Sequence, residues 1–172
     1  MRAALRSFPL ALPDFTPPND GASAAESRAA LSERWAARGL AADRLIFAAR
    51  VDPGRYRARL ALADLFLDTS PYNAGTIASD ALRMVLPLLT LRGTAFAARM
   101  ASSLLTAVGL MECIASTMDD YVGRAIAFGQ DRAAFAGIKA KLAGDTWMRT
   151  LGDSAGFAKR FEKVVASVRK KP

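Results

Sequence analysis

Short apolar runs alternate along this chain with stretches in which apolar residues recur every three or four positions. The apolar runs are bounded by turn residues and predict buried strands at 45–49, 62–67, 86–91 and 112–115. The stretches with helical spacing predict helices at 26–38, 76–84, 96–108, 117–129, 132–143 and 157–168. Strands that alternate with helices indicate an α/β fold: an open, mostly parallel, Rossmann-like sheet of about four strands with flanking helices.

Capping residues sharpen several of these boundaries. Gly39 and Gly109 follow helical stretches and predict helix C-terminal caps. Thr76 and Thr117 stand at helix starts and predict N-terminal caps. Asp52-Pro53-Gly54 predicts a turn that begins a further helix, which carries Arg55, Arg57 and Arg59.

Residues 1–25 differ in composition from the rest of the chain. Four prolines, at positions 9, 13, 17 and 18, interrupt any regular element there, and they also interrupt the apolar core that a secretory signal would need. We therefore expect a flexible Pro/Ala-rich leader over residues 1–25. A single domain is expected over residues 26–172, since this length suffices for one hydrophobic core.

The turn between the second and third predicted strands is the strongest candidate for a ligand site. An apolar run ends in Asp68-Thr69, a turn follows over residues 70–75, and a helix begins at Thr76. A junction of this kind directs free backbone N–H groups and the positive end of a helix dipole at one point, which suits a phosphate group. Asp68 has two interpretations, a catalytic acid or a structural acceptor for backbone amides, and we favour the second.

Composition excludes several kinds of chemistry. The chain has no histidine, so imidazole bases and Ser-His or Cys-His pairs are absent, and no carboxylate or cysteine cluster has the spacing of metal ligands. We expect no metal and no cofactor. The single cysteine, Cys113, lies in an apolar run and is expected to be a buried thiol in a reducing, cytoplasmic setting. No apolar run has the length of a membrane span.

The net charge of +8 raises the question of a nucleic-acid partner. Most arginines are scattered singly, as on solvated helix faces, and dense charge occurs only at residues 55–59 and 169–171. Nucleic-acid binding is therefore the least favoured of the functional hypotheses. Trp35 and Trp147 are far apart in the sequence, and we expect packing roles for both.

Three stretches carry a family resemblance. They read LADLFLDTSPYNAGTIASDAL at 62–82, LPLLTLRGTAFAARMASSLLTAVGL at 86–110 and, with a weaker match, ESRAALSERWAARGLAADRLIFAAR at 26–50. They resemble the carboxyl-terminal half of the catalytic region of the O-GlcNAc transferase and SPINDLY-like family, glycosyltransferase family 41, and its bacterial members in particular. The resemblance implies one Rossmann-like half of a GT-B glycosyltransferase that transfers N-acetylglucosamine from its UDP donor to protein Ser or Thr hydroxyls.

The resemblance also implies a donor site. By position in the family's motifs, Thr76 matches a phosphate-binding threonine, Asp80 an acid that holds the ribose, and Arg59 and Arg99 two family arginines. The expected UDP-sugar contacts are Arg59, Asn73, Ala74, Gly75, Thr76 and Asp80, with no catalytic residue in this chain.

The chain departs from the family pattern at three positions near the expected donor contacts. Ile77 replaces a second threonine, Tyr56 a histidine and Pro53 a lysine. The amino-terminal Rossmann half, the acceptor-binding repeats and the segment with the family's catalytic lysine show no counterpart. We therefore expect a fragment that is inactive alone and works beside an amino-terminal half supplied by another chain. The alternative is a non-catalytic nucleotide-binding or scaffold module.

Overall fold

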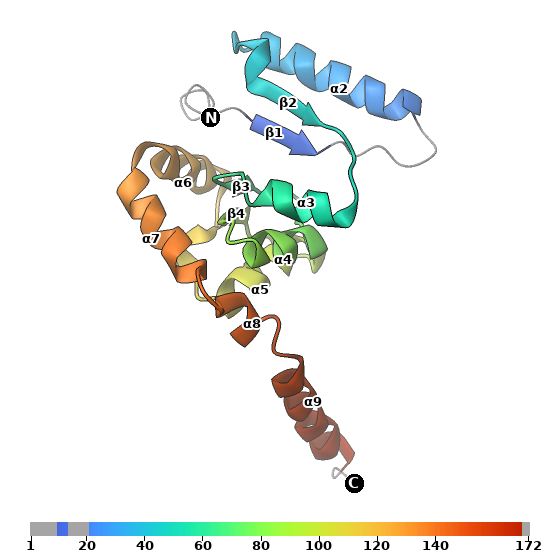
Figure 1. The fold of residues 1–172 in the computed structure, drawn as a ribbon, viewed down its shortest axis with the longest axis vertical. Helices are drawn as coiled ribbons and strands as arrows, with labels where there is room; N and C mark the ends of the chain where they lie inside the picture. Colours follow the sequence, from blue (N-terminus) through green and yellow to red (C-terminus); the bar gives the residue numbers. More distant parts are fainter. Residues whose placement is uncertain (1–9, 14–20, 170–172) are drawn as a thin grey trace.

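The computed structural model describes residues 10–13 and 21–169, and its strands form two parallel sheets (Figure 1). In the first sheet β1 (Leu10–Pro13) pairs with β2 (Leu45–Ala48). The second sheet has the order β3-β4-β5, with β3 at Phe66–Leu67, β4 at Leu88–Leu91 and β5 at Ile114–Ala115. The predicted α/β class with parallel strands and flanking helices is confirmed.

The helices lie close to the predicted positions. They are α2 Gly21–Ala36, α3 Pro53–Leu60, α4 Thr76–Arg83, α5 Met100–Ala107, α6 Met118–Gln130, α7 Arg132–Leu142, α8 Thr146–Arg149 and α9 Ser154–Arg169. The side chain of Asp52 caps α3, and the hydroxyl of Thr117 caps α6 by accepting from the Asp120 amide. Gly39 and Gly109 have the positive φ values, 67° and 77°, that predicted C-terminal caps require.

Two strand predictions need correction. The strand at residues 45–48 exists, but it lies with β1 in a sheet of its own and not in one sheet with the other predicted strands. β1 forms within the proline-containing stretch where we expected no regular element. The strand predicted at 62–67 is reduced to Phe66–Leu67, since Leu62 closes the turn after α3 and is 85% exposed. Residues 21–25, also expected in the leader, form the first part of α2, so this helix begins earlier than predicted. Residues 1–9 and 14–20 of the expected leader lie outside the described residues.

The main core is built around β4. Leu88, Leu89 and Thr90 are fully buried, and helices α4 and α5 cover the strand with Leu82 and Leu105, which are also fully buried. Ile138 and Leu142 of α7 join the same cluster. A separate, smaller cluster of Trp35, Leu40 and Leu45 lies between α2 and β2. The Trp35 indole donates to the carbonyl of Ala41, so this tryptophan packs, as predicted.

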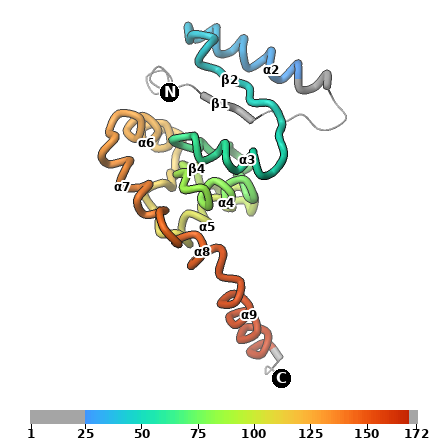
Figure 2. Tube along the Cα trace, in the orientation of Figure 1, coloured from blue at the N-terminus to red at the C-terminus, as the bar shows by residue number. Residues whose placement is uncertain are grey.

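The last helix extends away from the body of the molecule (Figure 2). The predicted amphipathic pattern does form α9, but its apolar side chains are exposed. They are Phe157, Phe161, Val164, Val165 and Val168. Within residues 10–13 and 21–169, no helix combines the length and the hydrophobicity that a bilayer crossing requires.

Candidate functional site

The turn that follows β3 is organised by the carboxylate of Asp68. One oxygen accepts from the backbone amides of Thr69 and Ala74, at 2.9 and 2.8 Å, and the other accepts from the hydroxyl of Thr90 on β4 at 2.6 Å. Tyr121 of α6 donates its hydroxyl to the Asp68 carbonyl at 2.9 Å. With 6% of its surface exposed and both oxygens engaged, Asp68 has the structural role that we favoured over a catalytic one.

Asn73 fixes the other side of the same turn. Its side-chain amide donates to the carbonyl of Thr69 at 2.8 Å, and its backbone amide donates to the carbonyl of Ala97, in the loop after β4, at 3.0 Å. Asn73 is 1% exposed. The Asn73 side chain is thus buried and holds the turn, and its expected contact with the donor stays a prediction.

The beginning of α4 presents free donors. Gly75 and not Thr76 is the N-cap residue, so the predicted capping role of the Thr76 hydroxyl is wrong. Among the described residues, no acceptor bonds the amides of Gly75, Thr76 and Ile77, whereas the Ala74 amide is used by Asp68. Thr76 is exposed, and its hydroxyl is free for a ligand. A Cβ at position 75 would lie 3.0 Å from Met100 Cε, so glycine permits this close approach.

Asp80 lies one turn further along α4, beside Tyr56 of α3. Burial raises the pKa of the Tyr56 hydroxyl, and the negative charge of Asp80 raises it further, which indicates that the two groups are close. No hydrogen bond or ion pair engages the Asp80 carboxylate within the described part of the chain. Arg59, the other expected donor contact, donates to the Ala49 carbonyl at 2.9 Å, so its guanidinium is held near the end of β2.

Two hollows of about 330 Å³ each lie near this turn. Phe96, Arg99, Met100 and Ser103 line the first, and Met100 connects it to Gly75. Gly75 and Thr76 themselves line neither hollow. Thr76 is exposed and Gly75 is partly exposed, so the start of α4 is accessible to solvent.

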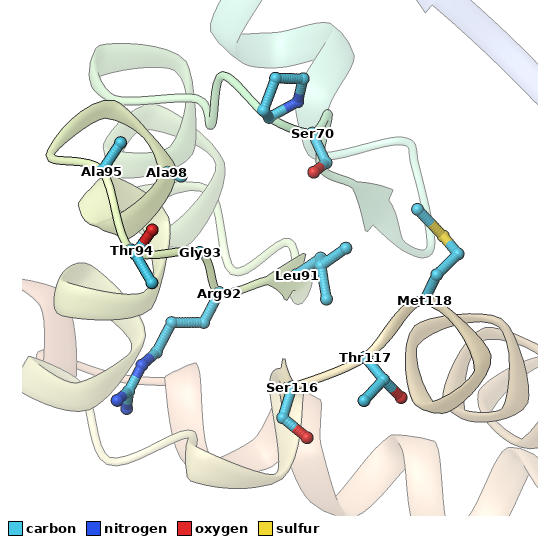
Figure 3. Close-up of a pocket in the computed structure, with 11 residues that line it drawn as sticks. Ser70, Leu91, Arg92, Gly93, Thr94, Ala95, Ala98, Ser116, Thr117 and Met118 are labelled. Carbon is cyan, nitrogen blue, oxygen red and sulfur yellow. The ribbon is translucent and has the colours of Figure 1, made fainter.

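The second hollow lies where three strands end (Figure 3). Its wall takes Ser70 from the turn after β3, Arg92 and Thr94 from the loop after β4, and Ser116 and Thr117 from the segment after β5. The sequence patterns indicated only turns and caps at these residues, and no ligand site was predicted from them. The signal for such a site is that all of them directly follow strands, because open α/β sheets bind ligands at the carboxyl ends of their strands.

The cysteine and the carboxylates of the described part of the chain were also compared with known kinds of reactive site. Burial, assisted by the charge of Glu112, raises the pKa of Cys113 to about 12, so this buried thiol stays protonated at neutral pH. No three carboxylate or thiol groups among residues 10–13 and 21–169 come together as a metal site would require. Trp147 packs under the guanidinium of Arg83, 5.0 Å from its ring centroid, and donates to Ser79.

Comparison with known proteins decides the family. The profile of glycosyl transferase family 41 matches residues 23–161, which include β2 to β5 and the turn after β3. The chain belongs to glycosyl transferase family 41. The resemblance seen in the sequence is thereby confirmed.

Relatives of this family 41 chain are long proteins. A UDP-N-acetylglucosamine–peptide N-acetylglucosaminyltransferase of Caenorhabditis elegans is 34% identical over 64% of the chain, and a probable SPINDLY transferase of Solanum lycopersicum is 32% identical over 62%. The chain spans 9% and 12% of their lengths. A solved Thermobaculum terrenum O-GlcNAc transferase mutant, K341M, matches 72% of the chain with a TM-score of 0.66 and 31% identity, over 24% of its own length.

Asp68 gives a direct test of what holds the turn. We expect Asp68→Ala to lower the free energy of unfolding by about 2–4 kcal/mol, because two amides and a buried hydroxyl lose their acceptor. Asp68→Asn keeps the shape and should cost less. Chemical denaturation measures both, with Asp64→Asn, an exposed carboxylate, as the control that should leave stability unchanged.

The environment of Asp68 also predicts how the stability of the wild type relative to Asp68→Asn depends on pH. Burial raises the pKa of Asp68, although its hydrogen bonds oppose the rise, so the folded protein binds this proton more tightly than the unfolded chain. The contribution of Asp68 to stability must then fall as pH rises above its unfolded pKa of about 4. The stability of the wild type relative to Asp68→Asn should therefore decline from about pH 4 upward. An increase over that range would contradict this account.

Proposed function

We propose that this chain is the donor-binding part of an O-GlcNAc transferase-like glycosyltransferase and that it holds the diphosphate of UDP-N-acetylglucosamine at the start of α4. The observation that carries the proposal is the set of free amides at Gly75, Thr76 and Ile77, which follow a strand end in a family 41 chain. The relatives are named as transferases that use UDP-N-acetylglucosamine and act on peptides.

The chemistry at this turn supports an anionic ligand. Consecutive N–H groups at a helix N-terminus point toward the same space, and the helix dipole favours negative charge there. Thr76 adds a hydroxyl donor one residue into the helix. The Asp68 and Asn73 hydrogen bonds fix the turn before any ligand arrives, so little conformational entropy remains to be lost on binding.

Asp80 and Tyr56 support a nucleoside beside the diphosphate. The Asp80 carboxylate can accept hydrogen bonds from ribose hydroxyls, and it lies one helical turn beyond Thr76 on the same face. The half-buried ring of Tyr56 next to it offers an aromatic surface to a base. In this arrangement Gly75, Thr76 and Asp80 touch the donor, whereas Asn73 and Ala74 hold the turn and Arg59 is engaged by Ala49.

A non-catalytic nucleotide-binding module is the second candidate. Two observations favour it: Ile77 offers an amide but no hydroxyl where the family carries a second threonine, and the Arg59 guanidinium is bonded to the Ala49 carbonyl. Both candidates predict nucleotide binding, and they differ in whether transfer follows once the remaining parts of an enzyme are supplied.

Calorimetry with UDP tests donor binding. We expect Thr76→Ala to weaken UDP binding by roughly tenfold or more, because a hydrogen bond to a charged phosphate is lost. Asp80→Asn should weaken UDP binding and leave pyrophosphate binding unchanged, since Asp80 is assigned to the ribose. Thr106→Ala and Asp64→Asn alter exposed side chains away from the turn and should bind both ligands as the wild type does. Wild-type protein that gives no heat at millimolar UDP would refute the donor site.

We expect the 172-residue chain by itself to bind donor without transferring the sugar. Glycosyl transfer requires the sugar phosphate and the acceptor hydroxyl to be held together with water excluded, and Thr76 at the start of α4 is exposed. Incubation with labelled UDP-N-acetylglucosamine and acceptor peptides measures this. Robust labelling of the peptides would contradict the expectation while leaving the donor site intact.

A further inference from the structure

We propose that Trp147 of α8 is a positioning residue for the donor site and that it acts on UDP binding through α4. The inference rests on the proposed function, since it concerns the free amides at the start of that helix. Trp147 is distant in sequence from the donor turn, but its indole joins α8 to α4 at two side chains, Ser79 and Arg83. The sequence predicted only a packing role for it.

The indole holds α4 by two different interactions. Its N–H donates to the hydroxyl of Ser79 at 3.3 Å, and the guanidinium of Arg83 lies over the ring, 5.0 Å from the centroid. Residues four apart in a helix lie on the same side of it, one turn from each other, so both contacts are made on one side of α4. Two contacts one turn apart restrict the tilt of the helix as well as its rotation.

The ring itself is held in place by the chain that follows α8. The Gly152 amide donates to the Trp147 carbonyl at 2.8 Å, and a Cβ at position 152 would lie 2.5 Å from Trp147 Cζ3. Glycine therefore permits the backbone to approach the ring this closely. Trp147 and Leu151 also pack against the main core. The ring thus has fixed neighbours besides Ser79 and Arg83, as a residue that positions another element requires.

The place of these contacts on α4 connects them with the donor site. Ala78 lies on the buried side of the helix, and Thr76 and Asp80 share the side proposed for the donor. With 3.6 residues per turn, Ser79 and Arg83 lie between those two sides. A rotation of α4 that moved Ser79 away from the indole would therefore also move Asp80 and the N-terminal amides.

Helix α4 is in this way attached at both ends. At its start, Asp68 accepts from the Ala74 amide at 2.8 Å, and at its end Arg83 lies over Trp147. The buried side between these points carries one large side chain, Leu82, and its other buried residues are alanines. The two attachments therefore contribute much of what fixes the direction of the helix. Free amides bind a phosphate best when they already converge on it, so loosening either attachment lowers affinity.

Calorimetry with UDP and with pyrophosphate tests this role. We expect Trp147→Ala, and Gly152→Ala, which displaces the ring, to weaken the binding of both ligands about fivefold. Trp147→Phe keeps a ring beneath Arg83 and should restore part of the affinity. Gly137→Ala makes the same change where a Cβ meets no neighbouring atom within 4 Å, and it should bind as the wild type does. The stoichiometry should be unchanged, because partial unfolding alone would lower the stoichiometry and leave the dissociation constant as it is.

The wild-type protein gives a second readout that does not require any variant to fold. If Trp147 acts on the donor site, a ligand bound there must act back on Trp147. The chain has two tryptophans, and UDP should shift the indole N–H signal of Trp147 in NMR spectra while leaving that of Trp35 in place. Wild-type protein that binds UDP with the Trp147 signal unmoved, or Trp147→Ala that binds UDP equally tightly, would overturn the inference and leave the donor site standing. Wild-type protein that does not bind UDP would refute the donor site and this inference with it.

Discussion

The buried carboxylate of Asp68 is the interaction on which the rest of the site depends. It ties the end of β3 to Thr90 on β4 and to the amide of Ala74 just before α4, and the Asp68 carbonyl receives the hydroxyl of Tyr121 from α6. Four elements therefore meet at one residue. The position of the α4 N-terminus, and with it the direction of its free amides, follows from these bonds and not from the helix itself.

Local patterns were sufficient to predict most of the elements. The caps at Asp52, Thr117, Gly39 and Gly109 formed where the sequence indicated, because capping depends on side-chain and backbone preferences within a few residues. The function of Asp68 was also predicted, since Asp-Thr before a turn commonly bonds nearby amides. The N-cap of α4 was predicted wrongly, because Gly75 is the N-cap residue and the Thr76 hydroxyl is left for other contacts.

The errors concern partners that are distant in sequence. The pairing of β2 with β1 could not be read from apolar runs, which give the existence of a strand but not its neighbour. The hydrogen bonds of two expected donor contacts were also not predictable: Asn73 donates to the carbonyl of Thr69 and Arg59 to the carbonyl of Ala49. Their contacts with a donor stay predictions.

The turn after β3 is held by the Asp68 and Asn73 hydrogen bonds, and the amides of Gly75, Thr76 and Ile77 beside it have no acceptor among the described residues. Amide chemical shifts recorded by NMR during titration with UDP test the central claim most directly. The account predicts the largest shifts at Gly75, Thr76 and Ile77. Shifts confined to the hollow around Arg92 and Ser116, or none at millimolar UDP, would contradict it.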